Sequence, residues 1–102
     1  MTNTFFVQLI DAMNNLSTIN VTTIDASKKT FEYLLKHVRK EHGYNFEKEM
    51  AANGINSSIT FRTWLNDEAT HSELRKYAQG RKVLAKYEKS VEKFNLTMAS
   101  LA

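Results

Sequence analysis

Apolar residues recur every three or four positions along most of this chain, which is the spacing that gathers them on one side of an α-helix. The first apolar stripe covers residues 5–16 and the second covers residues 31–38. We expect the second helix to be capped by Thr23 or Asp25 and to end at Gly43. Because proline is absent and only three glycines interrupt the chain, the pattern predicts a single all-α domain of about five helices over residues 1–102. The same pattern fits a whole protein or the N-terminal domain of a longer one.

The segment between these two helices has a different composition. Residues 17–23 are rich in β-branched side chains, which are poor helix formers. We therefore expect an extended linker, in which Ile19 and Val21 are candidates for a short edge strand. The first helix carries almost no charge on its polar side, which predicts that another element or another subunit covers it.

The middle of the chain has the layout of a helix-turn-helix. A short helix is expected from Phe46 to Asn53, capped by Asn45 and closed by Gly54, and Ser57 or Ser58 caps the helix that follows. In a helix-turn-helix, a support helix and a recognition helix cross over a short turn that often contains glycine. The side chains expected to anchor the crossing are Ile55, Phe61, Trp64 and Leu65. The alternative is a plain three-helix junction in which Trp64 is an ordinary core residue.

The second helix of the motif carries the residues predicted to contact DNA bases. They are Ser57, Ser58, Ile59, Thr60, Arg62, Thr63 and Asn66. Arg62 is suited to a bidentate guanine contact, and Ile59 to a thymine methyl group or a partner chain. The basic residues predicted to contact phosphates are Lys40, Lys48, Arg75, Lys76, Arg81 and Lys82. A formal net charge of +3 is compatible with double-stranded DNA as the partner.

The last helix is expected to begin near Tyr77 and carries a heptad pattern. Its apolar positions are Tyr77, Leu84, Val91 and Met98 in one series, and Tyr87, Phe94 and Leu101 in the other. Gly80 is the one weak position of that seam. The seam is explained equally well by a helix lying on its own domain's core and by pairing with a second copy. A homodimer joined through the first helix, the last helix or both is the predicted assembly.

The run from Ser58 to Leu65 reads S-I-T-F-R-T-W-L and is followed by N-D-E-A-T-H-S-E-L-R-K-Y-A and a basic helix. This order resembles the DNA-binding domain of phage terminase small subunits, with Arg62 one place earlier than the family's arginine and Leu74 in place of an aromatic residue. The positions that match in order are Ser58, Thr60, Trp64, Leu65, Arg75, Tyr77 and Ala78. The resemblance covers about residues 46–87 and implies DNA binding in a phage or another mobile genetic element. A terminase recognition subunit, the origin-binding domain of a replication initiator and a small regulator all fit it.

Other chemistry finds little support in the sequence. The absence of cysteine excludes disulfides and thiolate metal sites. The run from His37 to His42, H-V-R-K-E-H, has one residue too many for the inverted zinc-protease motif, and the three glycines are too far apart for a phosphate-binding loop. We therefore expect no metal, no cofactor, no small-molecule substrate and no enzymatic activity.

The apolar runs are too short to span a bilayer, and no basic flank precedes the first of them. This predicts a cytoplasmic protein without a membrane partner, and the resemblance to a phage family implies that the cell is a bacterial host. The alternative function is a small helical protein–protein interaction module, such as a phage-encoded inhibitor or an immunity protein. The neutral first helix and the heptad seam are the features that favour this alternative.

Overall fold

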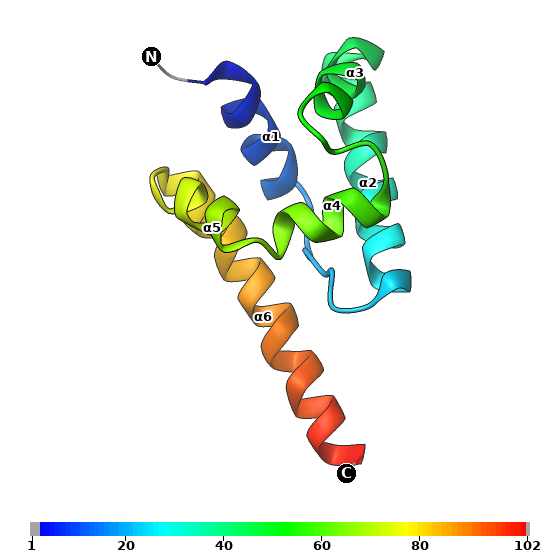
Figure 1. Cartoon of the computed structure of the whole chain (residues 1–102), viewed down its shortest axis with the longest axis vertical. Helices are drawn as coiled ribbons and strands as arrows, with labels where there is room; N and C mark the ends of the chain where they lie inside the picture. The colour runs from blue at the N-terminus through cyan, green and yellow to red at the C-terminus, as the bar shows by residue number, and fades with distance from the viewer. Residues whose placement is uncertain (1–2, 102) are drawn as a thin grey trace.

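The computed structural model describes residues 3–101, and every regular element within them is an α-helix, as the apolar spacing predicted. Along this part of the chain there are six helices: α1 (Thr4–Asn14), α2 (Ile24–His42), α3 (Tyr44–Ala52), α4 (Ser58–Leu65), α5 (Glu68–Arg75) and α6 (Ala78–Leu101). Figure 1 shows α1 to α5 gathered beside the N-terminal half of α6, whose other half extends beyond them.

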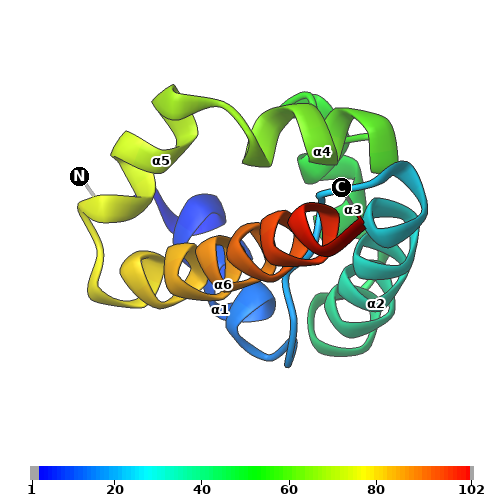
Figure 2. The same ribbon diagram turned by 90° about the horizontal axis from the view of Figure 1, so that it is seen from below.

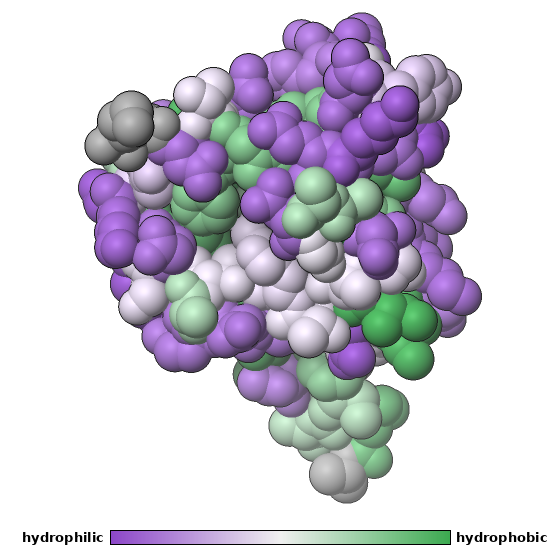
Figure 3. All heavy atoms as spheres, turned by 45° about the horizontal axis from the view of Figure 1, so that its top comes forward, coloured by the Kyte–Doolittle hydropathy of each residue, from purple (hydrophilic) through white to green (hydrophobic). Residues whose placement is uncertain are grey.

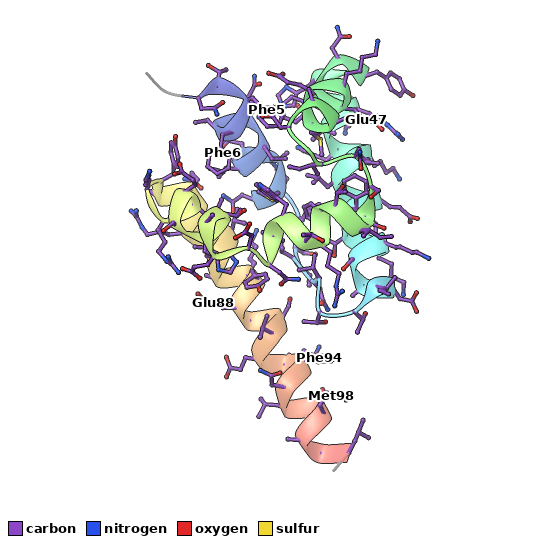
Figure 4. All side chains as sticks on the ribbon, in the orientation of Figure 1. Phe5, Phe6, Glu47, Glu88, Phe94 and Met98 are labelled. Atoms are coloured by element: carbon purple, nitrogen blue, oxygen red, sulfur yellow. The ribbon has the colours of Figure 1, made fainter. Side chains whose placement is uncertain are left out.

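One continuous apolar core holds the helices together, and α1 packs against both α2 and α6. Phe5 and Phe6 extend this packing to two sides of α1 (Figure 4). The Phe5 ring lies 5.3 Å from the ring of Phe46 in α3, and the Phe6 ring lies 5.6 Å from that of Tyr77, just before α6. The apolar side of α1 is therefore covered by the chain's own elements, whereas Thr4 and Asp11 on its polar side are exposed.

The expected linker between α1 and α2 is confirmed, but the short edge strand is wrong. Ile19 and Val21 are fully buried and fill the core. The backbone carbonyls around them are bound by side chains rather than by a second strand. The Asn20 carbonyl accepts from Thr30 Oγ1 at 2.9 Å, and the Val21 carbonyl accepts from Arg62 Nε at 2.9 Å.

The caps of α2 follow the prediction, whereas that of α3 does not. Thr23 Oγ1 accepts from the Ala26 amide at 3.0 Å, and Gly43, with φ of +76°, ends α2. The next helix begins at Tyr44, so Asn45 lies inside it and caps nothing. An ion pair between Arg39 Nε of α2 and Glu47 Oε2 of α3, 2.7 Å apart, holds the start of α3 against α2.

The residues after α4 form a helix, α5, in a stretch for which the sequence predicted no helix. The Asp67 side chain accepts from the Ala69 amide at 3.0 Å and starts the helix. His71 Nε2 lies 2.7 Å from the Leu65 carbonyl oxygen and holds α5 close to the end of α4. The fold therefore has one helix more than the sequence predicted.

The heptad seam of α6 is covered over only part of its length. Leu84 is buried, and Tyr77 and Tyr87 pack against the core while partly exposed. From Asn95 to Leu101 every residue is exposed. Among residues 3–101 no helix is both long enough and apolar enough to cross a membrane.

Candidate nucleic-acid interface

The connection between α3 and α4 is a tight turn built on a left-handed glycine. Gly54 has φ of +85°, and its amide donates to the Ala51 carbonyl at 3.0 Å. The Ile55 amide donates to the Met50 carbonyl at 2.9 Å, and both of these side chains are buried. This pair of bonds is a Schellman motif, which closes a helix and redirects the chain. The turn lets α3 and α4 both pack on α2.

Two of the predicted base-contacting residues form the cap of α4. The Ser57 side chain accepts from the Thr60 amide at 3.2 Å, and Thr60 Oγ1 accepts from the Ser57 amide at 2.9 Å. Thr60 Oγ1 also lies 2.9 Å from the Asn56 amide. The reciprocal bonds are a capping box with threonine in the place usually taken by Glu or Gln. Ser57 and Thr60 therefore start the helix, and their hydroxyl groups are occupied within the chain.

Arg62 is also engaged within the chain. Its Nε donates to the Val21 carbonyl at 2.9 Å, and its Nη2 lies 3.4 Å from the Thr22 carbonyl. The guanidinium thus joins α4 to the linker between α1 and α2. This geometry turns Arg62 toward the linker and away from the free outer face on which the sequence placed it, because Nε and Nη2 of the guanidinium are both directed at linker carbonyls.

The outer face of α4 consists of Ile59, Thr63 and Asn66, which are spaced to share one side of the helix and are all exposed. Ile59 has 67% of its surface exposed, although it is a large apolar residue. Ser58, the remaining predicted base contact, is half-buried. In Figure 3, which views the molecule from the α4 side, weakly polar residues drawn in white occupy the middle of the surface and strongly polar ones surround them.

Asn66 is oriented by a neighbour on α6. The Tyr87 hydroxyl donates to Asn66 Oδ1 at 2.6 Å, which leaves the amide nitrogen of Asn66 facing outward as a donor. Burial, followed by the charges of Glu68 and Glu88, raises the pKa of the Tyr87 phenol, so this hydroxyl remains a donor at neutral pH. The sequence offered no signal for this pairing, because the two residues are 21 positions apart.

Of the four predicted anchors, three are buried: Ile55, Phe61 and Leu65. Trp64 is packed against the core but remains partly exposed. Its ring meets Phe6 of α1 edge-on at 6.4 Å and lies 6.3 Å from Phe61 of its own helix. Trp64 thus packs α4 against α1, in addition to the contacts that Phe61 makes with α2.

The predicted phosphate contacts occupy three separate regions. Arg75, Lys76, Arg81 and Lys82 gather where α5 meets α6, Lys48 lies exposed on α3, and Lys40 lies on the outer side of α2. At the α5–α6 corner, Arg75 pairs with Glu68 at 3.0 Å and Lys76 with Glu73 at 2.9 Å. Arg81 donates to the Arg75 carbonyl at 2.8 Å. In Figure 2, α5 follows α4 along one side of the molecule and the chain turns away from that side at the α5–α6 corner, whereas Lys40 lines a groove beside α2.

Sequence reasoning gave little weight to a row of cations on the outer side of α2. Lys29, Lys36 and Lys40 line one groove together with Tyr33. Lys29 and Lys36 are seven residues apart and Lys36 and Lys40 are four apart, a spacing that places all three on one side of a helix. The sequence could not show that a groove runs beside them. Within residues 3–101 no three metal-ligating side chains come together.

No family model matches the chain, and no curated protein and no solved structure matches it either. The likeness to terminase small subunits rests on the sequence motif alone.

Proposed function

We propose that this chain is a sequence-specific double-stranded DNA-binding module that uses α4 as its recognition helix. The observation that carries the proposal is the arrangement of α3 and α4 on α2, joined by the glycine turn, with the outer side of α4 left uncovered. A recognition helix enters the major groove with its exposed side chains against base edges. The exposed side of α4 has no charged residue that would be desolvated there.

The base contacts are assigned to Ile59, Thr63 and Asn66. Ile59 is suited to the methyl group of thymine. The Thr63 hydroxyl donates to the Ile59 carbonyl and is therefore suited to accept from a donor on a base edge, and the outward amide of Asn66 is suited to an acceptor there. Lys82 and the cations beside it at the α5–α6 corner are suited to phosphates that flank the groove. Arg62 acts indirectly, by holding the linker to the back of the recognition helix.

The module is proposed to act as a homodimer through the projecting half of α6. The exposed apolar side chains of the heptad seam there include Met98 and Leu101, at 50% and 76%. Figure 4 shows Phe94 and Met98 on the part of α6 that extends from the body, and this end is coloured green in Figure 3. Residues flanking the heptad seam here, Asn95 and Thr97, are neutral and would not repel a second copy. Two copies would read half-sites about one helical turn of DNA apart.

Within this proposal, the motif favours a role in a phage or mobile genetic element, as a terminase-type recognition subunit, an origin-binding domain or a regulator. These roles share the same contact with duplex DNA. They differ in the protein that the DNA-bound module recruits.

Selection from a randomised duplex library, followed by titration of the selected and a scrambled duplex at several salt concentrations, tests the proposal. We expect tighter binding to the selected duplex and a steep loss of affinity with salt. Failure to bind any duplex at low salt would overturn the proposal of DNA binding.

The decisive variant is Thr63→Ala, with Ser100→Ala as its control. Both residues are exposed on a helix, and each hydroxyl donates to the carbonyl four residues earlier, Thr63 at 3.1 Å and Ser100 at 3.0 Å. Both variants therefore lose the same kind of hydrogen bond. Thr63→Ala should reduce discrimination by about 1 kcal/mol, at the low end for a base contact, and Ser100→Ala should leave discrimination unchanged. Equal discrimination in both variants would show that α4 does not read the site.

The uncovered apolar residues also favour a second candidate, a helical module that binds another protein. In that case the projecting end of α6 would be the contact surface, and the chain would have no duplex affinity. The duplex titration separates the two candidates.

A further inference from the structure

A groove of about 800 Å³ runs along the outer side of α2. One wall is formed by the end of α1 and the start of the linker, including Asn15, Ser17 and Thr18. The other wall is α2 itself, with Lys29, Tyr33 and Lys40. This side of α2 is turned away from α4, because Phe31, which contacts Phe61, lies about 200° around the helix from Tyr33.

The groove is basic, and its lysines are not paired. Lys29, Lys36 and Lys40 line it, and none of them lies in an ion pair with a described carboxylate. Among the described lining residues Asp25 is the single carboxylate. Each lysine can therefore exchange a counterion for a ligand phosphate without first breaking a contact of the fold.

Tyr33 lies in the middle of this row and is 65% exposed. An aromatic ring beside cations is a surface on which a nucleic-acid base can stack, and the stacking tolerates any base. A base in an intact duplex has both faces covered by its neighbours. Only an unpaired base can reach the ring. The exposed hydroxyl groups of Ser17 and Thr18 on the facing wall can donate to base edges or to the sugar–phosphate chain.

The length of the row distinguishes a strand from a free nucleotide. Lys29 and Lys40 are eleven residues apart on one helix, which corresponds to about 16 Å along its axis. The phosphate chain of a nucleoside triphosphate is shorter than this, whereas successive phosphates of an extended strand can follow all three lysines.

We propose that the groove along α2 binds single-stranded nucleic acid, with a base stacked on Tyr33 and the backbone following Lys29, Lys36 and Lys40. This goes beyond the proposed function, because it uses the opposite side of α2 and an unpaired strand. The two sites can succeed or fail separately.

The test uses the full chain and a fluorescent oligothymidylate of about eight nucleotides, titrated by anisotropy, with oligouridylate in a second arm. Tyr33→Ala should weaken binding at least about tenfold. Its control is Tyr44→Ala, which removes a tyrosine of similar exposure (69%) that does not line the groove. Both variants should keep the wild-type circular dichroism, and Tyr33→Ala should keep its affinity for duplex DNA.

A second experiment tests the role of the groove lysines through the salt dependence of binding. Replacing Lys36 and Lys40 together by Gln should lower the magnitude of the salt slope by about 1.4, because each phosphate contact on a single strand contributes about 0.7. The double replacement of Lys89 and Lys93 by Gln, exposed lysines of α6, changes the net charge equally and should leave the slope unaltered. Binding of either oligonucleotide with these losses supports the proposal.

Three results would overturn it: no binding at low salt, equal losses in the control variants, or competition by thymidine triphosphate as strong as that of the oligonucleotide. A loss of duplex affinity alone in Thr63→Ala concerns α4 and leaves the groove unaffected.

Discussion

Arg62 shows how a side chain that looks free in the sequence is used inside the fold. Its two bonds to the carbonyls of Val21 and Thr22 cross 41 and 40 residues of chain. Hydrogen bonds to a charged group contribute about 1.5–3 kcal/mol, and the partly exposed position of Arg62 favours the lower end. Arg62→Ala should therefore lower the free energy of unfolding by about 1.5 kcal/mol in urea denaturation. A variant as stable as the wild type would mean that these bonds contribute nothing, and would return Arg62 to the set of candidate base contacts.

Gly80 permits a backbone approach that no other residue allows. A Cβ atom at this position would lie 2.1 Å from the carbonyl oxygen of Leu74, and the obstacle is backbone rather than a movable side chain. Helix propensity alone predicts that Gly80→Ala stabilises α6 by about 1 kcal/mol. We expect the opposite sign, a net loss of about 1–3 kcal/mol, because α5 must shift away from α6. The sign of the change in the midpoint temperature of thermal unfolding decides between these two effects.

Among the elements, the corner between α2 and α3 depends on pH. The hydrogen bond and charge of Arg39 lower the pKa of the Glu47 carboxyl below its usual value. A lowered folded-state pKa gives stability that is present above the pH at which the unfolded carboxyl ionises, about 4.3, and is lost as the pH falls through the folded value.

Glu47→Gln should remove this part of the acid sensitivity. The effect is modest, because the Glu47 side chain is 30% exposed and the pair is screened. Glu49→Gln, an exposed glutamate of the same helix that forms no described ion pair, serves as control. Urea midpoints measured between neutral pH and about pH 3 should converge for wild type and Glu47→Gln at the acid end. Parallel curves throughout would contradict the prediction.

The elements also show what periodicity can predict. The stripes of α1, α2 and α6 were visible because apolar residues repeat along them, and Thr23 and Gly43 marked the ends of α2. The helix α5 was not predicted because it buries only Thr70 and Leu74, which is too few buried positions to form a visible apolar stripe. At the site, the turn at Gly54 and the core positions of α4 followed from local pattern. The capture of Arg62 and the groove along α2 did not, because both depend on segments that are remote in sequence.

At the scale of the molecule, the projecting half of α6 predicts the oligomeric state. Met98 and Leu101 belong to the heptad seam, and both are exposed. Replacing both by Gln should convert a dimer at micromolar concentration into a monomer without unfolding the domain, as measured by light scattering and circular dichroism. Leu96→Gln is the control, since Leu96 is as exposed but lies outside the seam. A wild-type chain that is monomeric at this concentration would remove the dimer from the proposal.

The same projecting end has a consequence for hydrogen exchange. The amides of residues 95–101 are bonded only within their own helix, and isolated helical segments shorter than about 12–15 residues are marginal in water. Their local opening should therefore require little free energy, and in dilute solution they should take up deuterium far faster than the amides around Leu84. Pairing with a second copy would bury these turns and slow their exchange as the protein concentration rises. Deuterium uptake along α6 thus maps where the two copies meet, residue by residue, without any measurement of mass.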